Sequence, residues 1–248
     1  MLDHSKKTWF EDKPLHTATF HAQLDAIKEL VRLGADIEGR QRTGQTPLHL
    51  ACVHRGLQKP AKLLLELGAK PTARDENAWT PLHGAARGEL DIVQNLLHKN
   101  NTSAFIESRS VHGDTALHVA ARDQMSHNFA MLLRAGANVR AVNGRGYNVL
   151  HYASETGNAS TVGQILDHPG GSILINLAGP WGHKPLHRAV EKGHAHIALT
   201  LIGHGADVRS EDACGKGDTP LHLAAEHGHE KAIMVLVESA DGQDLVFS

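Results

Sequence analysis

The sequence has few cysteines and no excess of charge of either sign. Only two of its 248 residues are cysteines, Cys52 and Cys214, a usage typical of a reducing, intracellular compartment. Its 25 basic and 27 acidic residues give a formal net charge of −2, so the basic excess that nucleic-acid binding requires is missing. We therefore expect an intracellular protein of the cytoplasm or nucleus, with no nucleic-acid partner.

Long apolar segments are also absent. No run of apolar residues approaches the roughly 20 residues that a membrane-spanning helix needs. No apolar segment follows Lys6 and Lys7, as it would in a signal peptide. The sequence therefore predicts no membrane insertion.

Aromatic residues make up only 4% of the chain, although hydrophobic residues make up 41%. That hydrophobic content is enough for folding, but the aromatic content is low for an enzyme built around one large core. No linker divides the chain, and 248 residues is long for a single compact core. A single domain over residues 1–248 that consists of many small cores in a row accounts for both observations.

One short string recurs along the chain. In its commonest form it reads Thr-Pro-Leu-His, and an alanine lies two positions after every histidine, as Ala51 follows His49. The steps between successive histidines are 33, 34, 35, 33, 36 and 35 residues, which is too regular for chance. A glycine often follows a few residues later and an apolar helix comes next, and several repeats close with Gly-Ala-Asp or a close variant. The motif histidines are His16, His49, His83, His118, His151, His187 and His222.

These units resemble the ankyrin repeat, whose period is 33 residues and whose signature is Thr-Pro-Leu-His-x-Ala. The resemblance covers roughly residues 10 to 238 and implies an all-α fold, a solenoid of stacked helix-turn-helix units joined by short β-hairpin loops. The expected repeats are 10–39, 43–75, 77–108, 112–143, 145–178, 181–212 and 216–240.

The motif residues have plain local roles. We expect the threonine to cap the first helix of each unit and the proline to occupy its first position, where no N–H is needed. The following glycine is expected to end that helix in a left-handed conformation. The first repeat departs from the pattern, with Lys13 in place of threonine and Ala22 in place of glycine.

The resemblance implies that the chain binds another protein through a concave groove formed by the hairpin tips and the exposed ends of the first helices. The partner-binding positions that this implies are Arg42, Gln45, Glu76, Asn77, Trp79, Arg87, His112, Asp114, Arg122, Arg145, Tyr147, Glu155, Trp181 and His183.

Three aromatic tip residues stand out among them, because tryptophan, tyrosine and arginine often anchor interfaces. Trp79, Tyr147 and Trp181 either contact the partner or cover a neighbouring hairpin, with Trp181 favoured as a contact because it follows Pro180. The exposed positions of the first helices also change sign along the chain. They run from Arg87 and Arg122 to Glu155, Glu191 and Glu226, which suits a partner with an acidic and a basic end.

No pattern indicates catalysis or a cofactor. The seven motif histidines recur at repeat spacing and cannot converge on one ion, so the resemblance gives them a structural role. His194, His196, His227 and His229 lie in two adjacent turns, but no Cys-x-x-Cys or His-Glu-x-x-His string accompanies them. We expect no metal, no cofactor and no catalytic residue, and we expect both cysteines to be free thiols because repeat spacing holds them far apart.

Three functions remain open. The first is a monomeric scaffold or adaptor that binds one or more proteins. The alternative is the ankyrin region of a larger enzyme, channel or receptor that recruits targets for it. The third is an enzyme whose site is built from histidine and aspartate residues of the groove. The last unit keeps apolar residues and no capping repeat follows it, so either the tail folds back over it or the array continues.

Overall fold

The computed structural model describes residues 13–213, 215 and 217–239. Cys214, the tail after residue 239 and the first three residues of the expected first repeat lie outside the described residues. The chain divides into two compact units, residues 1–111 and 112–248, and each is described here by itself.

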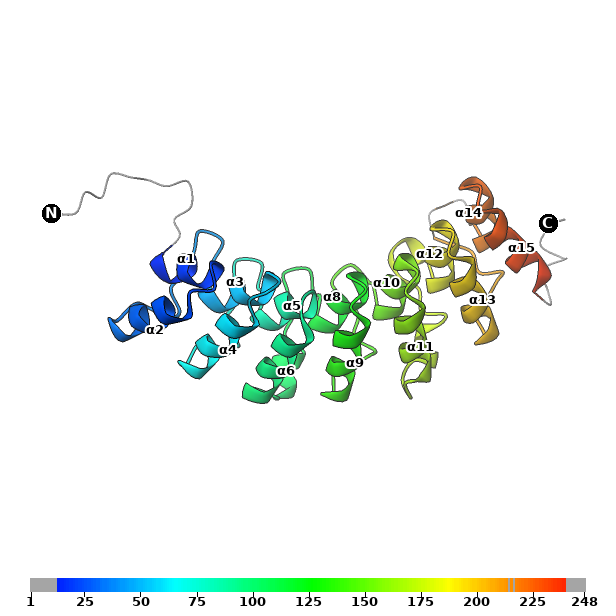
Figure 1. Cartoon of the computed structure of the whole chain (residues 1–248). Helices are drawn as coiled ribbons and strands as arrows, with labels where there is room; N and C mark the ends of the chain where they lie inside the picture. Colours follow the sequence, from blue (N-terminus) through cyan, green and yellow to red (C-terminus); the bar gives the residue numbers. More distant parts are fainter. Residues whose placement is uncertain (1–12, 214, 216, 240–248) are drawn as a thin grey trace. The chain divides into compact units, whose positions relative to one another are not determined.

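The first unit consists of helix pairs in which a short first helix and a second helix are joined by a tight turn (Figure 1). First helices pack against first helices (α1 on α3, α3 on α5) and second helices against second helices (α2 on α4, α4 on α6). Its helices are α1 (Pro14–Phe20), α2 (Leu24–Arg32), α3 (Pro47–Val53), α4 (Gln58–Glu66), α5 (Pro81–Ala86), α6 (Leu90–Lys99) and α7 (Ser103–Ile106).

The second unit repeats the same arrangement. Helices α8, α10, α12 and α14 form the row of first helices, and α9, α11, α13 and α15 form the row of second helices. Its helices are α8 (Ala116–Arg122), α9 (Ser126–Arg134), α10 (Val149–Thr156), α11 (Ala159–Asp167), η1 (Ser172–Leu174), η2 (Pro180–Gly182), α12 (Pro185–Glu191), α13 (Ala195–Gly203), α14 (Pro220–Glu226) and α15 (Glu230–Glu238).

The fold is therefore all-α, as predicted, and each expected hairpin is a loop. In the described part of the chain, the single isolated β-bridge joins Val142 and Asn148. The repeats bury their alanines and leucines between neighbouring helices; Ala51, Leu64 and Leu96, for example, have no exposed surface. Burial of each such leucine contributes roughly 1.5–3 kcal/mol, so stacking rather than the single helix pair stabilises the fold.

The turn after the first helix differs in part from the prediction. Gly56, Gly157, Gly193 and Gly228 have the expected positive φ, but Gly88 does not. In the first pair, Ala22 adopts a positive φ of 52°, and Gln124 adopts one of 61° at the same place after α8. The turn geometry is thus set by packing of the two helices even where no glycine is available.

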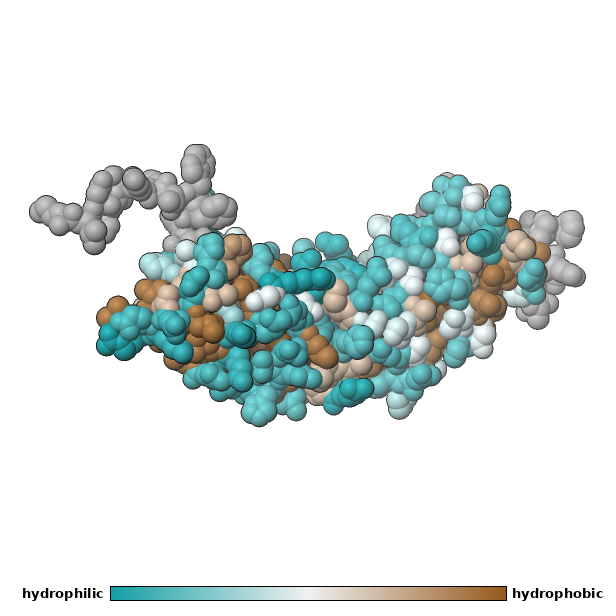
Figure 2. Space-filling view, viewed as in Figure 1, coloured by the Kyte–Doolittle hydropathy of each residue, from teal (hydrophilic) through white to brown (hydrophobic). Residues whose placement is uncertain are grey.

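Figure 2 shows hydrophilic side chains over most of the visible face of each unit, with smaller hydrophobic areas among them. None of the helices in the described ranges is long and apolar enough to cross a membrane.

Candidate functional site

Four of the motif histidines, His16, His49, His151 and His187, connect their first helix to the loop of the next helix pair through Nε2. The Nδ1 of His49 accepts hydrogen bonds from the backbone N–H and the hydroxyl of Thr46, at 3.2 and 2.9 Å. Its Nε2 then carries the proton and donates to the carbonyl of Trp79 at 3.0 Å. The Nδ1 of His151 accepts from the backbone N–H of Asn148 at 3.2 Å, and its Nε2 donates to the carbonyl of His183 at 3.0 Å.

These bonds and burial keep the imidazoles neutral. Burial lowers the pKa of His151 to about 4, and burial together with the nearby His183 lowers the pKa of His187 to about 4. The ring of His222 is exposed, and its Nδ1 bonds to Thr219. The histidines therefore hold the tips in place relative to the first helices.

The tips themselves are joined to one another by backbone hydrogen bonds. In the first unit, the N–H of Glu76 donates to the carbonyl of Thr43 (3.1 Å) and the N–H of Val111 donates to that of Asn77 (2.9 Å). In the second unit, the N–H of Gly144 donates to the carbonyl of His112 at 2.8 Å. Successive tips thus present their side chains from a continuous, ordered backbone.

The structure places the predicted contact residues at different depths. Asp114 and His183 were expected at the surface of the tips, but their side chains are buried, with 5% and 8% exposed. The exposed ones are Arg42, Glu76, Asn77, Arg87, His112, Arg145 and Trp181. The half-buried ones are Gln45, Trp79, Arg122, Tyr147 and Glu155.

The two buried residues are turned inward by partners of opposite charge or by hydrogen bonds. Asp114 accepts a hydrogen bond from the amide of Asn143 (2.7 Å) and lies 3.6 Å from the guanidinium of Arg122. His183 stacks on His187 with 5.4 Å between ring centres and bonds to Asp212 at 3.3 Å. Both therefore position neighbouring side chains rather than face solvent.

The three aromatic tip residues also differ. The ring of Trp79 lies over its own motif histidine, His83, with 5.7 Å between ring centres. Tyr147 stacks on Tyr152 at 5.1 Å and meets His151 edge-on at 5.8 Å. Trp181 is 62% exposed, so it is the most exposed aromatic side chain of the three.

A buried arginine that the sequence analysis did not single out organises the second unit. The guanidinium of Arg188 lies over the rings of Tyr147 and Trp181, 5.3 and 5.5 Å from their centres. It donates to the hydroxyl of Tyr147 (2.7 Å) and to the carboxylate of Glu191 (2.9 Å). Burial raises the pKa of Glu191, but hydrogen bonds from Lys192 and Arg188 outweigh it, and the pKa lies below its ordinary value.

The place of Arg188 within the repeat could have shown from the sequence that this arginine is unusual. It directly follows the motif histidine, a position that three other repeats fill with the apolar residues Leu50, Val119 and Leu223. Those residues are buried, and so is Arg188, with 5% exposed. A charged residue at a buried repeat position requires partners, and Tyr147 and Glu191 supply them.

The predicted change of sign along the first helices is partly cancelled within the chain. Arg122 pairs with Asp114 and Asp123, and Glu191 pairs with Arg188 and Lys192. Glu226 is exposed and Glu155 is half-buried. The charges of Arg122 and Glu191 are therefore engaged in holding side chains together.

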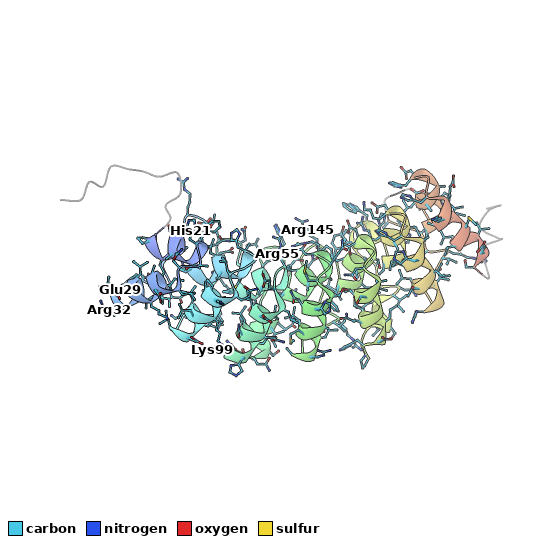
Figure 3. The ribbon with its side chains drawn as sticks, in the orientation of Figure 1. His21, Glu29, Arg32, Arg55, Lys99 and Arg145 are labelled. Atoms are coloured by element: carbon cyan, nitrogen blue, oxygen red, sulfur yellow. The ribbon has the colours of Figure 1, made fainter. Side chains whose placement is uncertain are left out.

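In the first unit, an exposed aromatic ring lies at the ends of α1 and α3. The ring of Phe20, 51% exposed, meets His54 edge-on at 5.3 Å. Figure 3 shows His21 and Arg55 on this side of the unit, whereas Glu29, Arg32 and Lys99 lie on the opposite side, on the second helices. The expected contact surface and the second-helix surface are therefore separate faces.

The histidine pairs near the end of the chain serve as links between repeats. His194 donates to the carbonyl of Glu155 and His229 to that of Glu191, both at 3.0 Å. Among the described residues, no group of three or more His, Cys, Asp and Glu side chains is placed to hold a metal ion. Cys52 is a free, buried thiol, as predicted, and burial raises its pKa.

Comparison with known proteins agrees with this architecture. The family model described as ankyrin repeats (3 copies) matches residues 2–75, 73–143, 124–212 and 150–246. The chain is 31% identical over 203 residues to human B-cell lymphoma 3 protein (79% of this chain, 44% of that protein). It is 34% identical over 187 residues to human ankyrin repeat and SOCS box protein 16 (71% and 40%).

A third relative is the transient receptor potential cation channel subfamily A member 1 of Drosophila melanogaster, 31% identical over 199 residues (78% of this chain, 16% of the channel). The chain thus spans less than half the length of each of these three relatives.

Solved structures share the fold. The ankyrin repeat domain of Bcl-3 superposes with a TM-score of 0.71 at 31% identity, over 89% of this chain and 98% of that one. The human ASB11 ankyrin repeat domain superposes with a TM-score of 0.75 at 23% identity, over 90% and 98%.

Proposed function

The chain belongs to the ankyrin-repeat family, and we propose that it is a protein-protein interaction module, a scaffold or adaptor, that binds its partner through the loop tips and the exposed ends of the first helices. The observation that carries this proposal is the exposed indole of Trp181 on an ordered tip. A large aromatic side chain held at the surface is a typical interface anchor.

The other tip residues support the proposal in both units. Arg42, Glu76, Asn77 and Arg145 are exposed, and they carry both signs of charge. The side chain of Arg145 points away from the helices in Figure 3. A partner protein with mixed polar and apolar side chains fits such a surface better than a nucleic acid does. We propose a monomeric, intracellular module with no catalytic role of its own.

Affinity capture with three forms of the chain tests the proposal. The tip variant carries R42A, E76A, N77A, R145A and W181A. The control variant carries E29A, R32A and K99A, exposed positions on the second-helix side of the first unit. We expect proteins bound by the wild type to be lost from the tip variant and kept by the control. Capture of the same proteins by all three folded forms would contradict the proposal.

A smaller experiment addresses two of the aromatic tips. The double variant W79A/W181A removes one half-buried and one exposed indole. If the folded double variant bound the partner as tightly as the wild type does, neither tryptophan would belong to the binding surface.

A second candidate function is that of a recruiting region within a larger enzyme, channel or receptor. It is favoured by the share of the relatives that the chain covers, between 16% and 44% of their length. An antibody raised against this chain would then detect a native protein well above 26.8 kDa. A native band at the mass of the chain would exclude this candidate.

A further inference from the structure

Trp181 occupies a strained backbone position. Its φ of 57° and ψ of 18° lie in the left-handed region, which favours glycine. The next residue, Gly182, also has a positive φ, as Gly113 and Gly146 do at the neighbouring tips, but the residues before those glycines do not. Holding a non-glycine residue in this region costs free energy. A glycine at position 181 would avoid that cost. The tryptophan therefore lowers the stability of this loop while it places an indole at the surface.

The backbone that carries the indole is fixed on both sides. The N–H of Ala213 donates to the carbonyl of Trp181 at 2.6 Å, and the N–H of Gly179 donates to the carbonyl of His183 at 2.8 Å. Pro180, which has one backbone rotation fixed by its ring, precedes the tryptophan. A contact made by an ordered side chain loses little conformational entropy on binding, so this tip is prepared for association.

One ring of the indole is supported by Arg188. The guanidinium lies 5.5 Å from the centre of that ring and is held there by Tyr147 and Glu191. Because Glu191 already pairs with Arg188, a charged side chain of the partner would find no unpaired charge of opposite sign in that ion pair. A charged group placed on the exposed part of the indole would lose water without gaining an ion pair there.

The charged side chains next to this tip already have ion-pair partners within the chain. Arg188 and Lys192 share the carboxylate of Glu191, and Lys184 pairs with Asp207 at 3.0 Å. A partner that brought a charged side chain here would compete with these existing ion pairs.

Two carboxylates and one further arginine near the two rings offset the positive charge that Arg188, Lys192 and Lys184 leave over from Glu191 and Asp207. Arg145 and Glu155 act with opposite sign on the hydroxyl of Tyr147, and the buried carboxylate of Asp212 bonds to His183. The surface around the indole is therefore matched to an uncharged group.

We propose that Trp181, supported by Arg188 and Tyr147, is an anchor site for an uncharged apolar side chain of the partner, a proline or an aliphatic residue. This rests on the proposed function as a protein-binding module and names the chemistry that one tip selects. The apolar side chain covers the exposed indole, and the removal of apolar surface from water stabilises the contact.

A display library of random twelve-residue linear peptides, selected on the whole chain, tests the anchor. The variant is W181G, which removes the indole and relieves the backbone strain, so the chain is expected to stay folded and to unfold at an equal or higher temperature. The control is L199A on α13, because Leu199 is also 62% exposed but lies on a second helix. Selected peptides are synthesised and their affinities measured by calorimetry.

We expect the selected peptides to share a position rich in proline or aliphatic residues. Their affinity should fall at least about tenfold on W181G, stay the same on L199A, and change less than about twofold between 50 and 300 mM salt. Replacement of the shared apolar residue by alanine should weaken binding to the wild type but not to W181G.

Peptides with a basic or acidic consensus, or peptides that bind W181G as well as the wild type, would overturn the anchor and leave the proposed function standing. Failure of the folded wild type to select any peptide would count against the proposed function itself.

Discussion

The guanidinium of Arg188 lies 5.3 Å from the ring centre of Tyr147 and donates a 2.7 Å hydrogen bond to its hydroxyl. The two residues come from different helix pairs, since Tyr147 precedes α10 and Arg188 lies within α12. This contact connects adjacent repeats through polar groups, and the ion pair between Arg188 and Glu191 holds the guanidinium in place. At the same repeat position, Leu50, Val119 and Leu223 are apolar.

Removal of this arginine should weaken the second unit. The change R188M keeps the apolar stem but leaves the half-buried carboxylate of Glu191 without its 2.9 Å partner. Loss of one member of a buried pair is strongly destabilising, and because Lys192 still contacts Glu191 we expect a loss of about 2–3 kcal/mol in the free energy of unfolding.

Urea unfolding followed by circular dichroism measures this loss. The variant K192M serves as the control, since Lys192 is exposed and its ion pair is expected to contribute less than about 1 kcal/mol. Equal stability of R188M and the wild type would show that the buried guanidinium does not hold the repeats together.

Stability should fall as the pH is lowered from 6.5 toward 4. The pKa values of His151 and His187 are about 4 in the folded chain because of burial, whereas a histidine in the unfolded chain has a pKa near 6.5. Between these values the unfolded chain binds more protons, so acid favours unfolding, and the full contribution is present above pH 6.5. Two such groups give a slope of at most about 2.7 kcal/mol per pH unit.

Urea midpoints at pH 7, 6 and 5 measure the slope. In H151Q one titrating group is absent, so we expect a smaller dependence on pH even though the variant is less stable at pH 7. A midpoint that does not change between pH 7 and 5 would show that these imidazoles are not buried in the neutral form.

Much of the fold could be predicted from the motif because its residues act locally. A proline at the first helical position marks the start of α3 at Pro47 and of α5 at Pro81, as the string Thr-Pro-Leu-His requires. The helix α7 was not predicted, because it lies in a stretch that the repeat does not contain. Thr102 begins it, and Phe105 and Ile106 turn inward.

The depth of the tip residues could not be read from repeat position alone. Asp114 and His183 occupy the same place as the exposed or half-buried tip residues, yet they are buried because Arg122 and Asp212 attract them. Such pairs join residues from different turns of the chain, and no single-repeat pattern encodes them. The exposure of Trp181 was favoured by the preceding proline, but its support by Arg188 depends on contacts between repeats.

Two glycines of the second unit should respond in opposite directions to replacement by alanine. Gly157 has a φ of 71°, and an added Cβ would lie 2.6 Å from the ring of His194. We expect G157A to lose more than about 1 kcal/mol and to break the bond from His194 to the carbonyl of Glu155. Gly163 lies inside α11 with nothing within 4 Å of its added Cβ, so G163A should gain about 0.5–1 kcal/mol.

Thermal unfolding of both variants under one condition measures these changes, and each serves as the control for the other. If G157A and G163A both raised the unfolding temperature, the close approach of Gly157 to His194 would not be the reason why glycine is needed at this turn.

The start of α12 offers a position where the repeat pattern should improve stability. Lys184 stands where Thr46, Thr80, Thr115 and Thr219 begin the equivalent helices, and their hydroxyls lie 2.8–2.9 Å from Nδ1 of the following histidine. The lysine offers only its backbone N–H to His187, at 3.2 Å, while its amino group pairs with Asp207.

The comparison of K184T with K184A isolates the cap, because both variants lose the ion pair with Asp207. A threonine N-cap stabilises a helix by about 1 kcal/mol relative to alanine, and the hydroxyl can reach Nδ1 of His187 as it does in the other repeats. We expect K184T to be more stable than K184A by about that amount in urea unfolding at pH 7. Because the ion pair to the half-exposed Asp207 contributes at most about 1 kcal/mol, K184T should equal or exceed the wild type. Equal stability of the two variants would mean that the backbone bond to His187 alone fixes the start of this helix.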